Sequence, residues 1–235
     1  YWVGCFASFD ARNRQVALAF TQLLDETGVD FAILGAEERC CGDPARRAGN
    51  EYLFQVLAQD NIERMKAYGV QRIVTACPHC YNVLKNEYSQ FGGEFEVVHH
   101  SRLLADLLAR GRLRRPTDYP ARLTYHDPCY LGRYNDEYDA PRRALAGVPG
   151  AELLEMERCR RDSFCCGGGG GRAWIEERLG RRINQMRVEQ ALATRPEAIV
   201  TGCPYCLTML EDGVRSLEAG LAVADLAEVL AGTVA

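Results

Sequence analysis

The sequence of 235 residues contains no apolar run near the roughly 18 residues that a membrane-spanning helix needs. It also lacks a basic segment followed by an apolar core at its start, so no secretory signal peptide is indicated. Neither sign of charge is in large excess, with 28 Lys and Arg against 32 Asp and Glu, which argues against a nucleic-acid partner. These absences predict a soluble, cytoplasmic protein.

An initiator methionine is also missing, and Tyr1 falls inside what reads as a strand. We therefore expect an upstream part of the natural protein to precede this chain. That part, or a partner, would then allow the protein to lie at the cytoplasmic face of a membrane.

Cysteine is the residue that is abundant, with 11 in the chain. An odd number weakens the case for complete disulfide pairing. Dense disulfides belong to small secreted domains without a large core, whereas a chain of this length can bury a core of its own. The cysteines are therefore predicted to bind metal as thiolates.

Ten of the cysteines form a tandem repeat in which a single Cys, a Cys-Cys pair and a Cys-Pro-x-Cys motif occur twice in the same order. Matched positions lie 124, 125, 125, 126 and 126 residues apart, so the two copies align almost without gaps. A Pro- and Arg-rich stretch near 111–120 interrupts the pattern and predicts two units, 1–115 and 116–235. The first copy contains Cys5, Cys40, Cys41, Cys77 and Cys80, and the second contains Cys129, Cys165, Cys166, Cys203 and Cys206.

Short apolar runs alternate with helical patterns in both copies, which predicts an α/β fold of two pseudo-symmetric β/α units with mainly parallel sheets. Ligands of such sheets lie at the carboxyl ends of the strands, where the cysteines are expected to converge. Predicted strands are 29–34, 70–76, 95–98, 122–126 and 198–202. Predicted helices are 12–27, 49–68, 80–90, 101–110, 172–194, 206–217 and 224–231.

The repeated motifs suit iron–sulfur chemistry. Thiolates are the usual ligands of iron in these clusters, and a Cys-x-x-Cys spacing brings two of them to one site at the start of a helix. Proline fits the first helical position, where its missing N–H costs nothing. A cubane of four irons needs four cysteines, whereas each copy here has five, which hints at a cluster of non-cubane shape.

Both copies resemble the CCG cysteine-rich domain family, in which a Cys, a Cys-Cys-Gly and a Cys-x-x-Cys are separated by gaps of about thirty-odd residues. The family includes the catalytic subunit of heterodisulfide reductase and the iron–sulfur subunits of glycolate, lactate and glycerol-3-phosphate oxidising systems. It also includes membrane-associated reductases that take electrons from electron-transfer flavoprotein. The resemblance implies two [4Fe–4S] clusters of possible non-cubane form, one on each set of five cysteines, lying near the interface of the two units.

The resemblance further implies an oxidoreductase module for electron transport between a flavoprotein or ferredoxin-type donor and a disulfide or quinone-linked acceptor. The donor can be an upstream domain of the same chain, and a membrane subunit linked to quinone is a further expected partner. Disulfide reduction and simple electron relay both stay open.

Two other interpretations compete with this one. Zinc also accepts Cys-x-x-Cys pairs, so a metal-stabilised docking module without redox chemistry is the alternative, and zinc in one of the two sites stays open. Cys-Pro-His-Cys at 77–80 also resembles a thiol–disulfide exchange pair, although the doubled motif argues against it.

Several residues near these motifs are candidates for roles other than ligation. Cys41, Cys166 and His126 are the catalytic candidates, with His126 acting as a proton donor, as a contact behind the cysteines or simply as a hydrogen-bonded group. Glycines 167–171 are predicted to allow close backbone approach to a cluster, with a flexible turn as the alternative. The basic stretch 178–187 is predicted to be a solvated helix face, or a docking surface for an acidic redox partner. His79 is expected beside a cluster without ligating it, His99 and His100 are expected to be structural, and Cys159 is expected to be a spare thiol.

Overall fold

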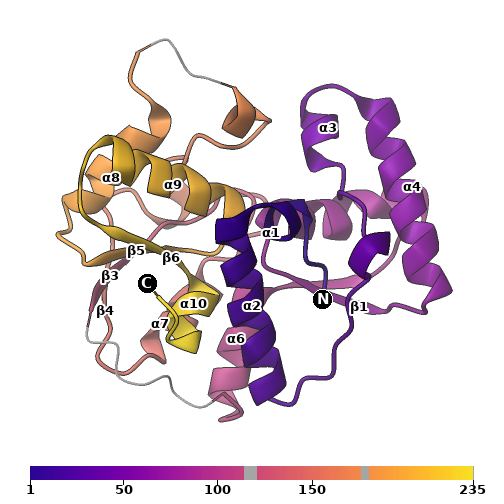
Figure 1. The fold of residues 1–235 in the computed structure, drawn as a ribbon, viewed down its shortest axis with the longest axis horizontal. Helices are drawn as coiled ribbons and strands as arrows, with labels where there is room; N and C mark the ends of the chain where they lie inside the picture. Colours follow the sequence, from indigo (N-terminus) through magenta and orange to yellow (C-terminus); the bar gives the residue numbers. More distant parts are fainter. Residues whose placement is uncertain (114–120, 176–179, 235) are drawn as a thin grey trace.

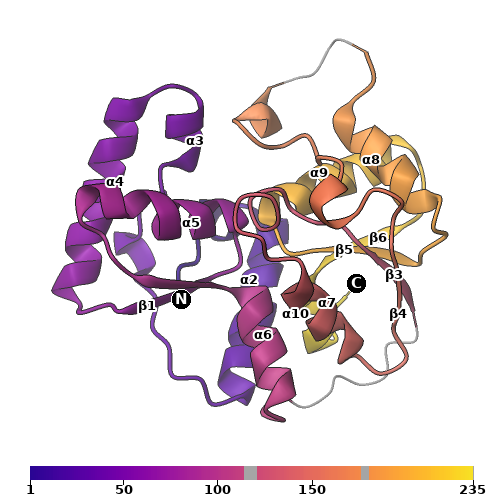
Figure 2. The ribbon, with the colours of Figure 1, turned by 180° about the vertical axis from the view of Figure 1, so that it is seen from behind.

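The computed structural model describes residues 1–113, 121–175 and 180–234, which form an α/β fold with two parallel sheets (Figures 1 and 2). One sheet has four strands in the order β4-β3-β5-β6, and the other has two, β1 and β2. The predicted fold class is therefore confirmed. No helix in these ranges is long and apolar enough to cross a membrane.

The four-stranded sheet belongs to the second copy of the repeat. Its strands are β3 (Arg122–Tyr125), β4 (Glu152–Leu154), β5 (Ala198–Thr201) and β6 (Ala222–Asp225). Its helices are α7 (Asp139–Ala146), α8 (Ile183–Leu192), α9 (Pro204–Ser216) and α10 (Leu226–Ala231). The central strands β3 and β5 are buried along most of their length, as expected of strands covered on both faces of a parallel sheet.

The two-stranded sheet belongs to the first copy and consists of β1 (Arg72–Thr75) and β2 (Glu96–His99). The main helices around it are α1 (Cys5–Phe9), α2 (Ala11–Glu26), α3 (Asp43–Arg47), α4 (Glu51–Ala67), α5 (Pro78–Asn82) and α6 (His100–Ala109). A π-helical turn, η2 (Val83–Glu87), and a 3₁₀ turn, η3 (Tyr88–Phe91), continue α5.

Equivalent hydrogen bonds show that the copies are structural repeats. Trp2 N donates to Val74 O at 2.9 Å, and His126 N donates to Val200 O at 2.8 Å. Trp2 and His126 are 124 positions apart, and Val74 and Val200 are 126 positions apart, which matches the offsets between the cysteines. Trp2 therefore occupies the place in the first unit that His126, directly after β3, occupies in the second.

Three predicted elements differ from the structure. Residues 29–34 form no strand: Tyr1 N donates to Ala32 O at 2.6 Å, but this single bond makes no ladder, and Trp2 forms only an isolated bridge with Thr75. The predicted helix 172–194 is helical only as a 3₁₀ turn, η5 (Arg172–Trp174), and as α8, because Gly180 (φ 67°) and extended Arg182 precede α8. Residues 176–179 of that prediction lie outside the described part.

The predicted helix 224–231 begins later, at Leu226, because residues 222–225 form β6. Asp225 caps α10 by accepting from Ala227 N at 2.8 Å, while Glu228 accepts from Asp225 N at 2.8 Å. This reciprocal capping box fixes the point at which the strand becomes a helix.

Helices from the first half pack on elements of the second half, so the two units share their core. Figure 1 shows α2 beside α10, and Arg12 of α2 pairs with Glu228 of α10 at 2.5 Å. One apolar cluster joins Phe20 and Leu104 from the first half with Val200 and Val229 from the second. The predicted boundary between residues 115 and 116 lies outside the described residues, and the division at that point remains a prediction.

Candidate metal centres

The five cysteines of the first copy come together from three segments, and we call this group the first site. Cys5 begins α1, and Cys77 follows β1 directly as the N-cap of α5, in which Cys80 lies. Cys40 and Cys41 precede α3 in a loop that turns at Gly42, whose φ of 91° suits glycine. The Sγ atoms of Cys41 and Cys80 lie 3.5 Å apart.

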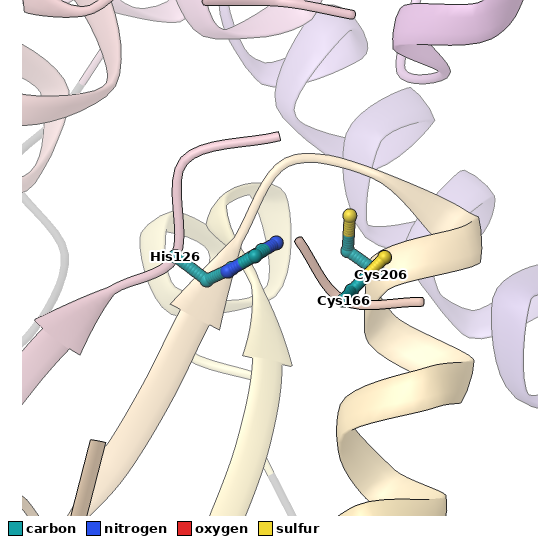
Figure 3. A group of neighbouring side chains, drawn as sticks. All are labelled: His126, Cys166 and Cys206. Atoms are coloured by element: carbon teal, nitrogen blue, oxygen red, sulfur yellow. The ribbon is translucent and has the colours of Figure 1, made fainter. Parts of the chain in front are cut away.

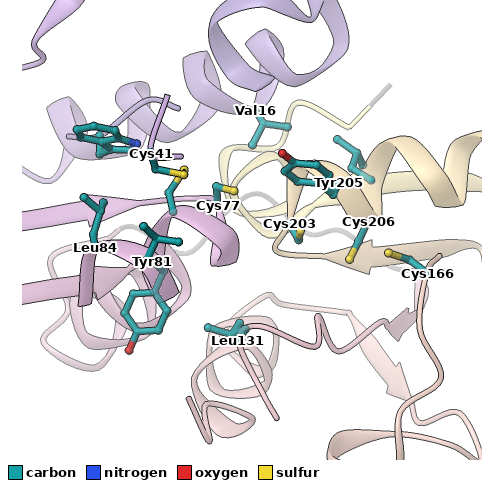
Figure 4. Close-up of a cluster of buried hydrophobic side chains, with 14 of the residues drawn as sticks. Val16, Cys41, Cys77, Tyr81, Leu84, Leu131, Cys166, Cys203, Tyr205 and Cys206 are labelled. Atoms are coloured by element: carbon teal, nitrogen blue, oxygen red, sulfur yellow. The ribbon is translucent and has the colours of Figure 1, made fainter. Parts of the chain in front are cut away.

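The second site repeats this arrangement with Cys129, Cys165, Cys166, Cys203 and Cys206. Cys203 follows β5 and is the N-cap of α9, with Cys206 in its first turn. Gly167, with φ of 91°, donates its backbone N–H to Cys165 Sγ at 3.2 Å, as Gly42 does to Cys40 Sγ at 3.5 Å. Figure 4 shows cysteines of both sites within one buried cluster, with Tyr205 between Cys77 and Cys206.

One cysteine of each site is set up to be a thiolate. Hydrogen bonds from Cys41 and Cys5 lower the pKa of Cys40 to about 3. Hydrogen bonds from Cys129 and Cys166 likewise lower the pKa of Cys165 to about 2. All eleven cysteines lie in the described residues, and none forms a disulfide. Each site therefore presents reduced sulfur ligands with at least one anionic sulfur among them, which is what a metal requires.

His126 lies behind the second site (Figure 3). One nitrogen of its ring and the Sγ atoms of Cys166 and Cys206 are all within 4.8 Å of one another. Nδ1 accepts a hydrogen bond from Arg187 Nε at 2.9 Å, so the ring proton is on Nε2. Burial and, to a smaller extent, the positive charge of Arg187 hold the pKa of His126 well below its usual value. His126 is therefore a neutral N–H donor close to the sulfurs of Cys166 and Cys206, which is the arrangement expected of a contact behind the cysteines.

The third residue of each Cys-Pro-x-Cys motif reaches toward the opposite site. His79 lies between Cys77 and Cys80, yet its side chain is hydrogen-bonded to Cys203 of the second site, and its Nδ1 lies 2.7 Å from Asp43 Oδ2. Its ring packs against Tyr130 at 4.4 Å and Tyr205 at 4.2 Å between ring centroids.

Tyr205 is the counterpart of His79 in the second motif, and it contacts the first site. It lines one small cavity together with Cys5, Cys41, Cys77 and Cys80. Burial and the charges of first-site cysteines, beginning with Cys77, raise the pKa of Tyr205 far above its usual value. The two sites are therefore neighbours. The crossed side chains that connect them were not predicted from the sequence.

The residues present fit iron–sulfur clusters. Each site has five sulfur donors, which exceeds the four that a structural zinc ion takes. Trp2 Nε1 is buried and has no hydrogen-bond partner among the described residues, and Trp2 is the counterpart of His126. An N–H donor without a protein acceptor is suited to a sulfide or thiolate of a bound cluster.

The remaining candidates take simpler positions. His100 Nε2 lies 2.9 Å from Asp225 Oδ1 and His99 Nδ1 lies 2.8 Å from Ser101 Oγ, so both have the structural contacts expected of them. Cys159 is half-buried and outside both sites. In the glycine segment, a methyl group added at Gly167 or Gly168 would meet side chains of α8 or α9 closely, whereas one added at Gly169, Gly170 or Gly171 would meet nothing within 4 Å.

The basic stretch is not uniformly solvated, and this prediction was wrong for Arg187. Its side chain is fully buried beside the second site, although Arg181 is exposed and pairs with Glu189, and Arg182 is half-buried and pairs with Asp212. Arg178 lies outside the described residues.

Paired five-thiolate sites at the strand ends of two repeated α/β units define a class of metal-binding, cysteine-rich redox proteins. The profile of the cysteine-rich domain family CCG matches residues 1–85 and 123–211, and the chain belongs to this family. The resemblance stated from the sequence is thereby confirmed.

Known relatives agree with the predicted class of function. The chain is 51% identical over its whole length to 34% of the probable iron–sulfur-binding oxidoreductase FadF of Bacillus subtilis. It is 48% identical, over 97% of its length, to 33% of the EtfAB:quinone oxidoreductase of Syntrophomonas wolfei. Over 98% of its length it is 37% identical to 58% of one polypeptide of the dihydromethanophenazine:CoB–CoM heterodisulfide reductase of Methanosarcina mazei.

The chain thus spans about a third of the first two relatives and somewhat over half of the third. The relatives are oxidoreductases or iron–sulfur subunits of oxidoreductases, which confirms the expected class of an iron–sulfur electron-transfer module.

Proposed function

We propose that the chain holds two four-iron clusters, one at each five-cysteine site, and relays electrons between them as part of an oxidoreductase. The observation that carries this proposal is the convergence of two matched sets of five reduced cysteines, joined by the His79–Cys203 contact. Clusters bound there supply one-electron transfer. Backbone N–H groups of Gly42 and Gly167 stabilise the anionic sulfurs.

The packing between the sites favours relay over reduction of a disulfide held between them. His79 is 4% exposed, and its ring lies against Tyr130 and Tyr205, so aromatic side chains occupy the space between the two sites. A disulfide substrate needs an opening that admits its sulfur atoms to the metal. Electron transfer needs only proximity, which this packed interface provides.

The names of the relatives support the choice of partners. One is an oxidoreductase of EtfAB and quinone, and another is part of a heterodisulfide reductase. We infer that this chain receives electrons from a flavoprotein or a ferredoxin-type domain and delivers them to a quinone-linked or disulfide-linked acceptor. A membrane-anchored ferredoxin among the relatives supports a place at the cytoplasmic face of a membrane.

Metal analysis tests the proposal directly. We expect anaerobically purified protein to contain about eight irons and eight acid-labile sulfides per chain, with a visible spectrum that bleaches on reduction. Cys41→Ser should remove roughly half of the iron, because it deletes a buried ligand of the first site only. Cys159→Ser is the matched control and should leave the iron content unchanged. Two zinc ions without sulfide would contradict the redox function and support a structural module.

A further inference from the structure

The two sites differ in the charge of the buried residues behind them. α4 and α8 are equivalent helices, because the same hydrogen bond follows the end of each. Gly69 N donates to Lys66 O after α4, and Arg195 N donates to Leu192 O after α8. Donor and acceptor of the second bond both lie 126 positions after those of the first. The same offset equates Asn61 in α4 with Arg187 in α8. Both side chains are fully buried, but Asn61 is neutral and Arg187 is a cation.

Arg187 is held without a carboxylate. Its guanidinium donates to His126 Nδ1 at 2.9 Å, to Arg158 O at 2.9 Å and to Gln190 Oε1 at 2.9 Å. Among the described residues no Asp or Glu forms an ion pair with it. Burial lowers the pKa of Arg187 to about 10, which still leaves the group charged at neutral pH.

Asn61 makes corresponding contacts in the first unit without a charge. Its Nδ2 donates to Cys40 O at 3.1 Å and to Tyr88 Oη at 3.1 Å, and its Oδ1 accepts from Arg39 N at 3.2 Å. Each residue therefore anchors the segment that leads to its Cys-Cys pair. The anchoring role is shared, and the positive charge belongs to the second site alone.

Other charged groups near Arg187 leave this difference in place. Asp127 accepts from both terminal nitrogens of Arg142, at 2.7 and 2.9 Å, and Arg142 also pairs with Glu155 at 2.5 Å, so these two carboxylates share one cation and neither forms an ion pair with Arg187. Position 38, two residues before Cys40, is Glu, and the matched position 163 is Ser. The two oxygens of Glu38 accept from Val3 N and Gly4 N. The first site thus has a carboxyl group where the second has a hydroxyl.

We propose that Arg187 raises the reduction potential of the second site above that of the first, so that an electron entering the module comes to rest at the second site. A buried cation stabilises the more negative, reduced form of a nearby cluster. The His126 ring, held by Arg187 with its Nε2–H facing Cys166 and Cys206, adds a neutral donor in the same direction. Each step transfers one electron from a flavin or iron–sulfur donor, and no bond is formed or broken.

This inference rests on the proposed function, and redox titration tests it separately from metal content. Wild-type chain is titrated with dithionite in the presence of viologen mediators and followed by paramagnetic resonance. Signals are assigned with Cys77→Ser and Cys203→Ser, each of which lacks a ligand of one site. We expect the second site to be reduced at the higher potential.

Arg187→Gln should lower the ratio of reduced to oxidised second cluster about tenfold or more at a fixed potential, with the first cluster unchanged. Arg187→Lys keeps the charge and should retain most of the wild-type value. Arg181→Gln is the matched control, because it removes one exposed charge from the same region, and should shift neither site. If Arg187→Gln does not fold, Ser163→Asp serves instead, because Ser163 Oγ lies 3.4 Å from Arg187 Nη2 and a carboxylate there offsets the cation.

Two results would overturn the inference while leaving the proposed function intact. One is a wild-type first site that is reduced at a potential equal to or higher than that of the second. The other is an Arg187→Gln or Ser163→Asp protein with full iron and sulfide whose second site titrates as in the wild type. Absence of iron and sulfide from wild-type protein would instead contradict the proposed function itself.

Discussion

His79 shows how one residue connects two sites that are far apart in the sequence. The residue lies inside the first Cys-Pro-x-Cys motif, but its hydrogen bond to Cys203 contributes to stabilising a thiolate of the second site. Burial raises the pKa of Cys203, and the bonds from Cys206 and His79 outweigh that effect and bring it to about 6. Asp43 holds the other ring nitrogen at 2.7 Å, which fixes the orientation of the ring.

Replacing this ring should therefore damage the opposite site. His79→Phe keeps an aromatic ring between Tyr130 and Tyr205 but loses the hydrogen bond to Cys203. We expect a chelator to remove iron from the second site about tenfold faster, because hydrogen bonds to charged groups stabilise them by about 1.5–3 kcal/mol. Iron release under anaerobic conditions measures this effect. Tyr205→Phe is the matched control in the other motif. If His79→Phe released iron faster from the first site alone, the crossed contact would be disproved.

At the scale of single elements, helices α8 and α9 approach closely at Gly213. This contact helps to hold α9, which carries Cys203 and Cys206 of the second site at its start, in place. A methyl group at Gly213 would lie 2.9 Å from Val188 Cγ2 and 3.0 Å from Asn184 O. The second of these is backbone and cannot move without shifting α8. The packing of the two helices therefore depends on a residue that disfavours helix formation by itself.

Gly213→Ala separates these two effects. Helix propensity alone predicts a gain of about 1 kcal/mol, whereas overpacking in a well-packed core typically costs about 1–3 kcal/mol. We expect net destabilisation, seen as a lower urea midpoint for the metal-loaded protein. Gly169→Ala is the control, since nothing lies within 4 Å of its added methyl group and its φ is not positive. Equal or higher stability of Gly213→Ala would show that α8 yields to the methyl group.

Local sequence patterns predicted those elements whose structure is determined locally. β1, β5, α2 and α4 follow from apolar runs and caps, and the ten cysteines converge because strand ends meet at one edge of a sheet. The last two residues of strand β6, Ala224 and Asp225, were predicted as helix because they directly precede the helical pattern of α10. Helix α7 and strand β4 were missed, since both are short, with 8 and 3 residues.

Long-range contacts were beyond the reach of such patterns. The buried position of Arg187 depends on His126, 61 residues earlier, and the contact of His79 depends on Cys203, 124 residues later. A run of arginines is typical of a solvated surface, so its sequence gives no sign that one member is buried. Comparing matched positions of the repeat, such as Asn61 and Arg187, is the one signal that marks this difference.

At the scale of the whole molecule, the two repeats are interlocked rather than joined end to end. α2 of the first repeat packs on α10, and α6 packs on α7, so that both repeats complete one apolar core. Arg12 also pairs with Glu211 of α9 at 2.6 Å and with Glu228 of α10 at 2.5 Å. The two sites are thereby held at a fixed separation, which suits transfer of electrons between them.

This interlocking predicts that the two units, 1–115 and 116–235, do not fold independently although they are repeats. Produced alone, the first would expose Phe20, Leu23 and Leu24 of α2, which are at most 1% exposed in the intact chain. The apolar area of such side chains contributes about 1.5–3 kcal/mol each when buried, which is a large part of the stability of a unit this small. We expect each fragment to be insoluble or to lack a cooperative urea transition, whereas co-expressed fragments should associate, recover that transition and bind iron at both sites. A single fragment that folds cooperatively and binds about four irons would show instead that the repeats are independent domains, and that the α2–α10 contact only orients them.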